Sequence, residues 1–390
     1  LREVLREKVW KFSVDLRNIV PTWRAFKHPR PIISPGTIDP SGAGTVSFIY
    51  KHDLERPYVL FYEALYEAGI VRADSADGLT WTKSSDYVLK RDKSYDLNGI
   101  GDQSVLWDLL DGLYYMWYEG RGEDGVRRIC LATSQDGIKW TKHGPVLGPW
   151  DVLEIIGARV AKKDDEYFML IQARPKGTGR NQLYLSKSTD PKSFPIPKPV
   201  FLFSPQSPVC YFSLDDATLY WMNGYWLMLY AAHNRSDMER SLTIRAAVSY
   251  DAEVWVDVGE VVEASAGYRL VHEPCLGWTP EGYRLFFTHH HHSENKGYIW
   301  FAWMPLDMEK FVQPLIDVDS IAAGGEVHVD LDDVWQEAAS LTVRVTYGAG
   351  ASAGVRVYLL SSPDYNFANL DSENSTDAFT YFDPSFTAGG

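Results

Sequence analysis

The sequence predicts an all-β protein built around a five-bladed β-propeller, because two independent markers recur five times. The first marker is a turn motif, Ser-x-Asp-Gly-x-x-Trp, at residues 75–81 and 134–140. Looser copies occupy residues 188–194, 249–255 and 305–311. The Asp residues of successive copies are 59, 54, 61 and 56 residues apart. A repeat of roughly 40 to 60 residues is typical of propeller blades.

The second marker is a strand rich in aromatic residues that keeps the same period. It reads YVLFY at 58–62, YYMWY at 114–118, YFMLI at 167–171, YWLML at 225–229 and YRLFF at 283–287. We interpret the turn motif as structural. Its Asp accepts backbone N–H groups, its Gly takes a positive φ, and its aromatic residue fills the gap between blades.

The two ends of the chain lack the repeat. Apolar residues of segment 1–20 recur at helical spacing, which predicts an amphipathic helix ended by Pro21. After residue 315, the stretches 326–330, 340–346 and 354–360 alternate in polarity, which predicts strands of a small β-sandwich. We therefore expect an N-terminal helix and lead-in (1–30), a catalytic propeller (31–315) and a C-terminal β-sandwich-like module (316–390).

Composition excludes several classes of function. The formal net charge of -14 argues against nonspecific binding of nucleic acid or of an anionic membrane surface. No apolar run reaches the ~18 residues that span a bilayer. Cys130, Cys210 and Cys275 lie far apart, so their spacing predicts neither a disulfide framework nor a zinc site. The 14 Trp, 23 Tyr and 17 Phe suit blade packing and also the stacking of sugar rings. The compartment and the oligomeric state stay open.

The functional site of a propeller is expected where the innermost strands surround the axial channel. The loops that lead into the first three blades align without gaps from Asp39, Asp96 and Asp151. A residue that repeats in every blade is more often structural, so we interpret Asp96 and Asp151 as turn residues. The residues that break the repeat, together with their counterparts in blades four and five, are Asp102, Glu154, Arg159, Asp215, Asp216, His272 and Glu273.

A ring of carboxylates is what cleavage of a glycosidic bond requires. One carboxylate acts as base or nucleophile, and one carboxylic acid protonates the leaving oxygen. A third carboxylate can raise the pKa of that acid by like-charge repulsion. Two other interpretations stay open, since oxygen clusters also suit calcium and all of these acids could lie in satisfied turns.

The chain resembles the five-bladed propeller glycosidases, the superfamily that holds glycoside hydrolase families 43, 32, 68, 117 and 130. The resemblance rests on the Ser-x-Asp-Gly-x-x-Trp endings and on the blade core at 104–120, and it covers about residues 31–315. The predicted sandwich resembles the C-terminal domain of family 32. The resemblance implies a base or nucleophile at Asp39, an orienting and pKa-tuning Asp102, and a general acid at Glu154.

The sequence also departs from these families. It lacks the Trp-x-Asn-Asp-Pro-Asn-Gly and Glu-Cys motifs of family 32, so sucrose- or fructan-type activity is not indicated. Glu273, in His-Glu-Pro, resembles the Glu-Gly-Pro acid of family 43 as well as Glu154 does. The candidates for substrate binding are Arg159, Asp216, His272, Arg174, Trp107 and His290.

Two further features leave alternatives open. Arg121, Arg159 and Arg174 could hold phosphate or a sugar carboxylate, which would suit a phosphorylase or a uronoside substrate. The histidine run at 289–292 is a solvated loop, a contact at the channel rim, or a general acid of the kind proposed for family 117.

We therefore expect a glycoside hydrolase of furanosidase- or xylosidase-like specificity, with a carbohydrate as its partner. A phosphorylase or transglycosidase on the same fold is the alternative among enzymes. A non-catalytic carbohydrate-binding propeller is the alternative outside them. No cofactor is required for this chemistry, and a structural calcium ion in the channel is an option for the same oxygen donors.

Overall fold

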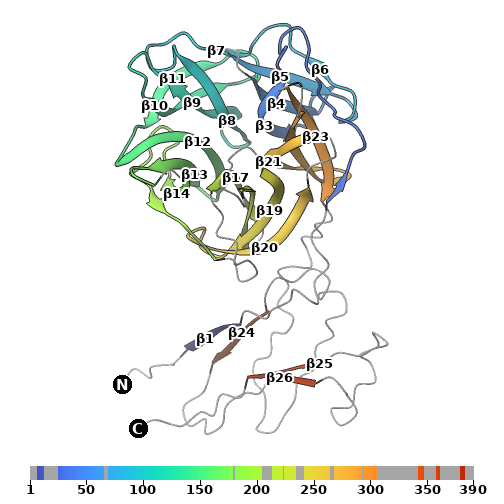
Figure 1. Ribbon diagram of the computed structural model, residues 1–390, viewed down its shortest axis with the longest axis vertical. Helices are drawn as coiled ribbons and strands as arrows, with labels where there is room; N and C mark the ends of the chain where they lie inside the picture. Colours follow the sequence, from blue (N-terminus) through green and yellow to red (C-terminus); the bar gives the residue numbers. More distant parts are fainter. Residues whose placement is uncertain are drawn as a thin grey trace. The chain divides into compact units, whose positions relative to one another are not determined.

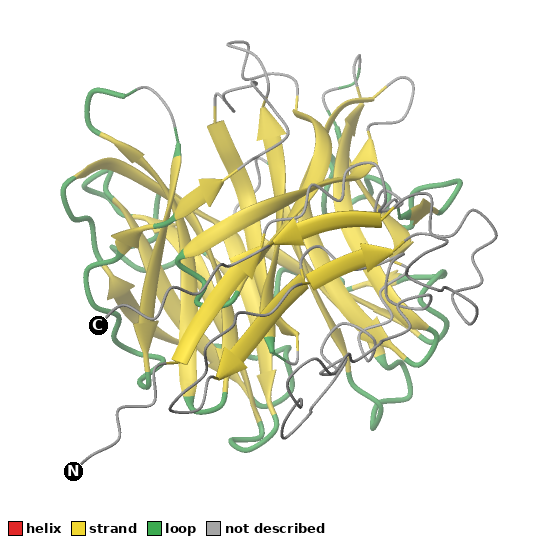
Figure 2. Ribbon diagram, turned by 90° about the horizontal axis from the view of Figure 1, so that it is seen from below, coloured by secondary structure: helices red, strands yellow, loops and turns green. Residues whose placement is uncertain are grey.

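The computed structural model describes thirteen parts of the chain. They are residues 7–12, 25–65, 69–178, 181–203, 213–222, 224–233, 241–263, 268–291, 294, 296–304, 341–346, 357–360 and 378–382. The chain divides into two compact units, Thr22–Leu306 and a second unit formed by Leu1–Pro21 with Asp307–Gly390. Every regular element among the described residues is a strand (Figure 2). This part of the chain accordingly contains no helix that could span a membrane.

The unit Thr22–Leu306 is a five-bladed β-propeller, as predicted (Figure 1). Blade 1 holds β3 (Ala43–Tyr50), β4 (Tyr58–Ala64), β5 (Gly69–Ser75), β6 (Thr82–Lys83) and β7 (Leu89–Lys90). Blade 2 holds β8 (Gly99–Asp108), β9 (Leu113–Arg121), β10 (Arg127–Ser134) and β11 (Thr141–Leu147). Blade 3 holds β12 (Val152–Lys163), β13 (Glu166–Pro175), β14 (Gln182–Ser188) and β15 (Lys198–Pro199).

The last two blades complete the ring. Blade 4 holds β17 (Ser213–Met222), β18 (Tyr225–His233), β19 (Ser241–Ser249), β20 (Val254–Glu263) and a parallel edge strand, β16 (Phe201–Phe203). Blade 5 holds β21 (Tyr268–Thr279), β22 (Gly282–His291), β23 (Gly297–Met304) and β2 (Phe26–Lys27). The innermost strands β3, β8, β12, β17 and β21 each contact the next one around the ring, and β21 contacts β3.

The start of the propeller closes its last blade. Strand β2 pairs with β23, with Phe26 opposite Trp303. An isolated bridge joins Ile33 to Ile299, and a parallel one joins Gly42 to Gly297. These pairings satisfy the outer edge of β23, so blade 5 combines residues from both ends of the unit.

The aromatic marker forms the second strand of every blade, namely β4, β9, β13, β18 and β22. Both neighbours of a second strand are hydrogen-bonded strands, and its side chains alternate between the two faces of the blade. Most of the largest fully buried side chains come from these strands, among them Tyr62, Trp117 and Trp226. Because each aromatic side chain buries roughly 150–250 Å², these strands supply much of the core between blades.

The turn motif has the structural role predicted for it. In blade 1, Ser75 Oγ accepts the N–H of Gly78 at 2.8 Å, and Asp77 Oδ1 accepts the N–H of Leu79 at 2.8 Å. Gly78 has a φ of 68°, and a Cβ placed on it would lie 2.1 Å from Arg284 Nη1 of blade 5. A glycine is therefore needed there for its conformation and for the contact between blades.

The second unit corrects one prediction at the N-terminus. Strand β1 (Glu7–Phe12) pairs antiparallel with β24 (Leu341–Thr346), so the predicted helix over residues 1–20 is wrong for these six residues. Pairing with a partner more than 300 residues away overrides the local helical spacing, because strand formation depends on cross-strand neighbours.

Two of the three strands predicted in the C-terminal module overlap β24 and β25 (Val357–Leu360). Strand β25 pairs with β26 (Ala378–Phe382). The predicted strand at 326–330 and the fifth turn motif at 305–311 lie outside the described residues. The β-sandwich therefore stays a prediction.

Candidate active site

Three acidic residues of the innermost strands share an uncommon backbone conformation. The φ angles are 46° at Asp102, 53° at Asp216 and 54° at Glu273. Each residue lies in a β-bulge, where the pairing with the second strand breaks in β8, β17 and β21. A left-handed residue other than glycine costs on the order of 1–3 kcal/mol and is concentrated at functional sites, and bulges re-aim side chains there. These three acids are therefore the strongest candidates for function.

The other two blades carry small residues at the corresponding bulge. Thr45 in β3 donates its hydroxyl to Asp102 Oδ1 at 2.9 Å. A Cβ on Gly157 in β12 would lie 2.8 Å from the Cβ of Asp102, so glycine leaves room for that side chain. The acids thus come from blades 2, 4 and 5, while blades 1 and 3 make space for them.

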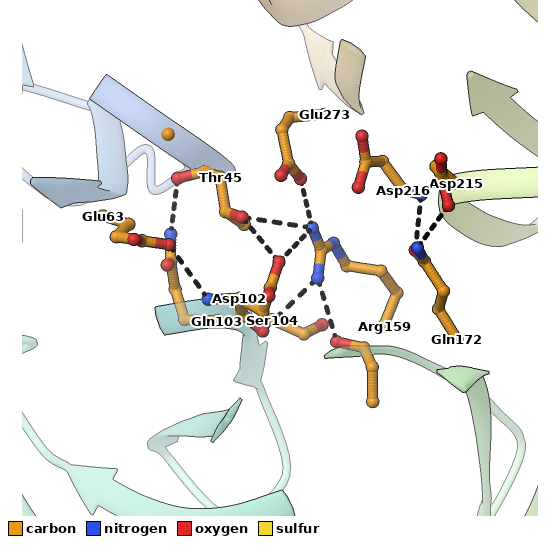
Figure 3. A network of polar contacts seen from close by, with 12 residues as sticks. Thr45, Glu63, Asp102, Gln103, Ser104, Arg159, Gln172, Asp215, Asp216 and Glu273 are labelled. Carbon is orange, nitrogen blue, oxygen red and sulfur yellow. Dashed lines mark hydrogen bonds and ion pairs between the residues drawn. The ribbon is translucent and has the colours of Figure 1, made fainter. Parts of the chain in front are cut away.

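Arg159 lies between two of these acids (Figure 3). Its Nη2 is 2.6 Å from Glu273 Oε2 and 3.8 Å from Asp102 Oδ1. The two carboxylate oxygens therefore lie no more than 6.4 Å apart, the sum of these contacts. Arg159 and Glu273 are each only 7% exposed, so this contact is shielded from water.

A histidine joins the same cluster. His272 Nδ1 is 3.2 Å from Asp216 Oδ2 and 3.8 Å from Glu273 Oε1. The ring of His290, on β22, lies edge-on to His272 at 4.7 Å. Side-chain exposure is 16% for His272 and for Asp216 and 19% for Asp102, so solvent reaches this side of the cluster.

The charges of the cluster do not balance if every acid is ionised. Burial raises the pKa of Glu273 well above its usual value, and the negative charge of Asp216 adds to this effect. Burial also raises the pKa of Asp102, whereas the positive charge of Arg159 lowers it for both acids. One guanidinium cannot neutralise three ionised carboxylates, and the raised pKa of Glu273 favours a proton on that acid.

Two further acids near Asp102 were not predicted from the sequence. Burial and the charge of Asp102 raise the pKa of Glu63 to about 8 and that of Glu119 to about 7. Both follow the aromatic marker directly, after Tyr62 and Tyr118. The sequence signal that could have identified them is a glutamate at the same position in two blades, directly after the aromatic marker.

Two of the predicted residues lie toward solvent. Glu154 Oε1 pairs with Arg174 Nη1 at 2.6 Å, and their side chains are 30% and 26% exposed. Arg127 Nε lies 3.8 Å from Glu154 Oε2 and 3.3 Å from Glu119 Oε1. Glu154 is therefore linked to the cluster through Arg127 and Glu119.

The structure does not bring Asp39 to the cluster. Its side chain is fully buried and is held by Lys83 Nζ at 2.6 Å and by the Tyr62 hydroxyl at 2.8 Å. Asp96 of blade 2 has the same arrangement, with Lys142 Nζ at 2.6 Å. A contact set repeated in two blades fits a role in blade architecture, which explains why this Asp recurs in the sequence.

Trp107 also lies away from the cluster. It is five residues beyond Asp102 on β8, or about 16 Å along an extended strand. Its ring contacts Tyr114 at 4.6 Å, and Lys51 Nζ lies 4.1 Å above it. These contacts suit packing at the opposite end of the strand.

One set of donors in the described part of the chain could hold a metal ion. Donor atoms of Asp216, His272 and Glu273 all lie within 4.8 Å of one another. Calcium takes six to eight oxygen ligands, and this set offers two carboxylates and a nitrogen. Arg159 also places a positive charge 2.6 Å from Glu273. The set therefore fits calcium poorly, and calcium in the channel stays an untested prediction.

Comparisons with known proteins agree with this fold. The chain is 27% identical over 244 residues to a 1,2-beta-oligomannan phosphorylase of Thermoanaerobacter sp. (strain X514), covering 62% of this chain and 75% of that protein. It is 31% identical over 102 residues to a sucrose-6-phosphate hydrolase of Escherichia coli, covering 25% and 21%. No family model matches the chain.

A solved structure of a thermostable family-43 glycoside hydrolase superposes with a TM-score of 0.53 at 17% identity. The match covers 68% of this chain and 91% of that structure. The chain therefore shares its five-bladed β-propeller fold with a family-43 glycoside hydrolase, as the resemblance in sequence predicted.

Proposed function

We propose that this chain is an enzyme that cleaves a glycosidic bond, with Glu273 as proton donor and Asp102 as base or nucleophile. The observation that carries the proposal is the convergence of acids from strained bulges around one buried arginine. A binding module without catalysis would have no need to hold several buried carboxylates against their desolvation cost.

The roles follow from the surroundings of each acid. Burial and the charge of Asp216 raise the pKa of Glu273, which favours the protonated form that can protonate the leaving oxygen. Asp102 receives the Thr45 hydroxyl at 2.9 Å and lies 3.8 Å from Arg159, contacts that stabilise its charged form. That carboxylate would attack the anomeric carbon or activate a water molecule. A furanosidase- or xylosidase-like specificity is our first expectation, in keeping with the resemblance to family 43.

Phosphorolysis is the second candidate, and the similarity to a phosphorylase favours it. Arg127 and Arg174 are 23% and 26% exposed beside the cluster, and guanidinium groups bind phosphate well. Both now contact Glu154. A phosphate ion would therefore compete with Glu154 for them.

The test is turnover of a panel of nitrophenyl glycosides and polysaccharides, with and without phosphate. The variants are Glu273→Gln and Asp102→Asn, with Glu154→Gln as a control because it lies toward solvent. We expect the first two to lose about 10²- to 10⁴-fold in kcat while keeping native circular dichroism, and the control to retain most of its rate. Activity that requires phosphate would select the phosphorylase.

Two results would contradict the proposal. Undiminished turnover in both cluster variants would mean that other groups perform the chemistry. Binding of sugars by a wild-type protein that turns over none of the panel would indicate a carbohydrate-binding propeller.

A further inference from the structure

On the second strands of blades 1, 2, 3 and 5, one position directly follows the aromatic marker, on the face that packs against the next blade. It is filled by Glu63, Glu119, Gln172 and Thr288. In blades 1, 3 and 5, a hydrogen bond joins this side chain to the bulge in the innermost strand of the next blade. The position therefore supports the backbone on which the site is built.

The contacts of Glu63 and Gln172 are alike (Figure 3). Glu63 Oε2 accepts the backbone N–H of Asp102 at 3.3 Å. Gln172 Oε1 accepts the backbone N–H of Asp216 at 2.7 Å. Each contact fixes the N–H of a left-handed acidic residue, the point at which the bulge departs from regular pairing. An amide thus does in blade 3 what a carboxyl group does in blade 1.

The surroundings of Glu63 favour its protonated form. The charged groups that act on it are Asp102 of β8, Glu119 of β9 and Arg159 of β12. Burial and the charge of Asp102 raise its pKa to about 8, with Arg159 acting in the opposite direction. Glu63 therefore carries a proton at neutral pH and resembles a glutamine in charge.

Glycines confine the carboxyl group of Glu63. A Cβ on Gly101 would lie 2.6 Å from Glu63 Oε2, and a Cβ on Gly44 would lie 3.5 Å from it. Glu63, whose side chain is partly buried, thus lies close to the backbones of β3 and β8. These close approaches limit its movement and suit a support for Asp102.

We propose that Glu63 is a positioning residue, which holds Asp102 in its bulge through an uncharged carboxyl group as Gln172 holds Asp216. The proposal rests on the role of Asp102 in the proposed function. Glu63 itself neither touches the substrate nor transfers a proton to it. A glutamine should therefore replace it, and an apolar residue should not.

The kinetic test compares Glu63→Gln with Glu63→Leu at pH 6, and uses Gln172→Leu as the matched variant in blade 3. We expect Glu63→Gln to keep kcat within about threefold of wild type, and Glu63→Leu to lose about 100-fold in kcat with little change in KM. Gln172→Leu should lose activity similarly, through Asp216. If Glu63→Gln falls as far as Glu63→Leu, a charged carboxylate is needed and the proposal is wrong. If Glu63→Leu keeps full activity, Glu63 positions nothing.

A second readout does not depend on activity. The pKa of Glu63 is higher in the folded than in the unfolded chain. The contribution of Glu63 to the free energy of unfolding is therefore lost as pH rises from about 4.5 to about 8. The Tm of Glu63→Gln should therefore rise relative to wild type between pH 5 and pH 8.5. If wild type cleaves no glycoside but this shift appears, the proposed function fails while the uncharged state of Glu63 stands. If the Tm shows no such shift, Glu63 is not uncharged at neutral pH and the proposal is wrong, whatever the activity.

Discussion

Arg159 donates a buried hydrogen bond of 2.6 Å to Glu273, although the two residues are 114 residues apart in the sequence. One comes from blade 3 and the other from blade 5. Removing the guanidinium leaves the buried acids around it without a cation, and the loss of one partner of a buried charge interaction typically costs about 3–5 kcal/mol. The pair therefore links catalysis to the stability of the innermost strands.

Replacement of Arg159 by methionine should lower both activity and stability. We expect the free energy of unfolding to fall by about 3 kcal/mol, because the buried acids lose their positive partner. The double variant Arg159→Met/Glu273→Gln should recover part of the stability and none of the activity. Urea unfolding followed by tryptophan fluorescence measures both. A single variant as stable as wild type would show that the guanidinium of Arg159 contributes nothing to folding.

Replacement of Lys83 by methionine should lower stability and spare catalysis. The change leaves Asp39 buried without its cation, which we expect to cost about 3 kcal/mol, while kcat stays near the wild-type value. Lys142→Met makes the same change beside Asp96 and should behave alike. Loss of activity without loss of stability in Lys83→Met would return Asp39 to the site, as the resemblance in sequence first implied.

Stability should be highest in mildly acidic solution. The folded-state pKa of Glu119 is raised to about 7, so its contribution to stability is lost as pH rises from about 4.5 through 7. Burial lowers the pKa of His289 to about 3, so its contribution is lost as pH falls below about 6.5. We expect the highest Tm between about pH 5 and 6.5, and a smaller decline toward pH 8 in Glu119→Gln. A Tm that climbs steadily from pH 5 to pH 8 would contradict this assignment.

Removal of divalent metal ions should leave the rate unchanged. The proposed proton donor and base are carboxyl groups, and the donors of Asp216, His272 and Glu273 fit calcium poorly. The measurement is turnover after dialysis against EDTA, with a magnesium-treated sample as control. Loss of activity that calcium or another divalent ion restores would assign these three residues to a metal centre.

The propeller could be predicted because two independent markers recur in every blade. The site could be predicted only in part, since its geometry depends on where the bulges fall. The sequence shows that Asp102 and Glu273 break the repeat, but not that bulges turn both toward Arg159. Asp39 was assigned by its order along the chain, whereas the structure places it in the same contacts as Asp96.

The predicted N-terminal helix is a different kind of error. Residues 7–12 have apolar side chains at a spacing that also fits a helix, and nothing nearby in the sequence indicates a partner strand. That partner, β24, lies at the other end of the chain. Pairing over such a distance is decided by tertiary structure and cannot be read from a local pattern.

Closure of blade 5 by β2 has a consequence for synthesis on the ribosome. Phe26 and Lys27 emerge about 270 residues before β23, the strand with which they pair. Translation proceeds at roughly 5–20 residues per second, so the early strand waits many seconds for its partner. A nascent chain that stops after blade 4 therefore has an open ring with unpaired edges. Chaperones that bind nascent chains would have the most unpaired strand edge to cover in that interval. Closure of the ring would then be a single late step of folding.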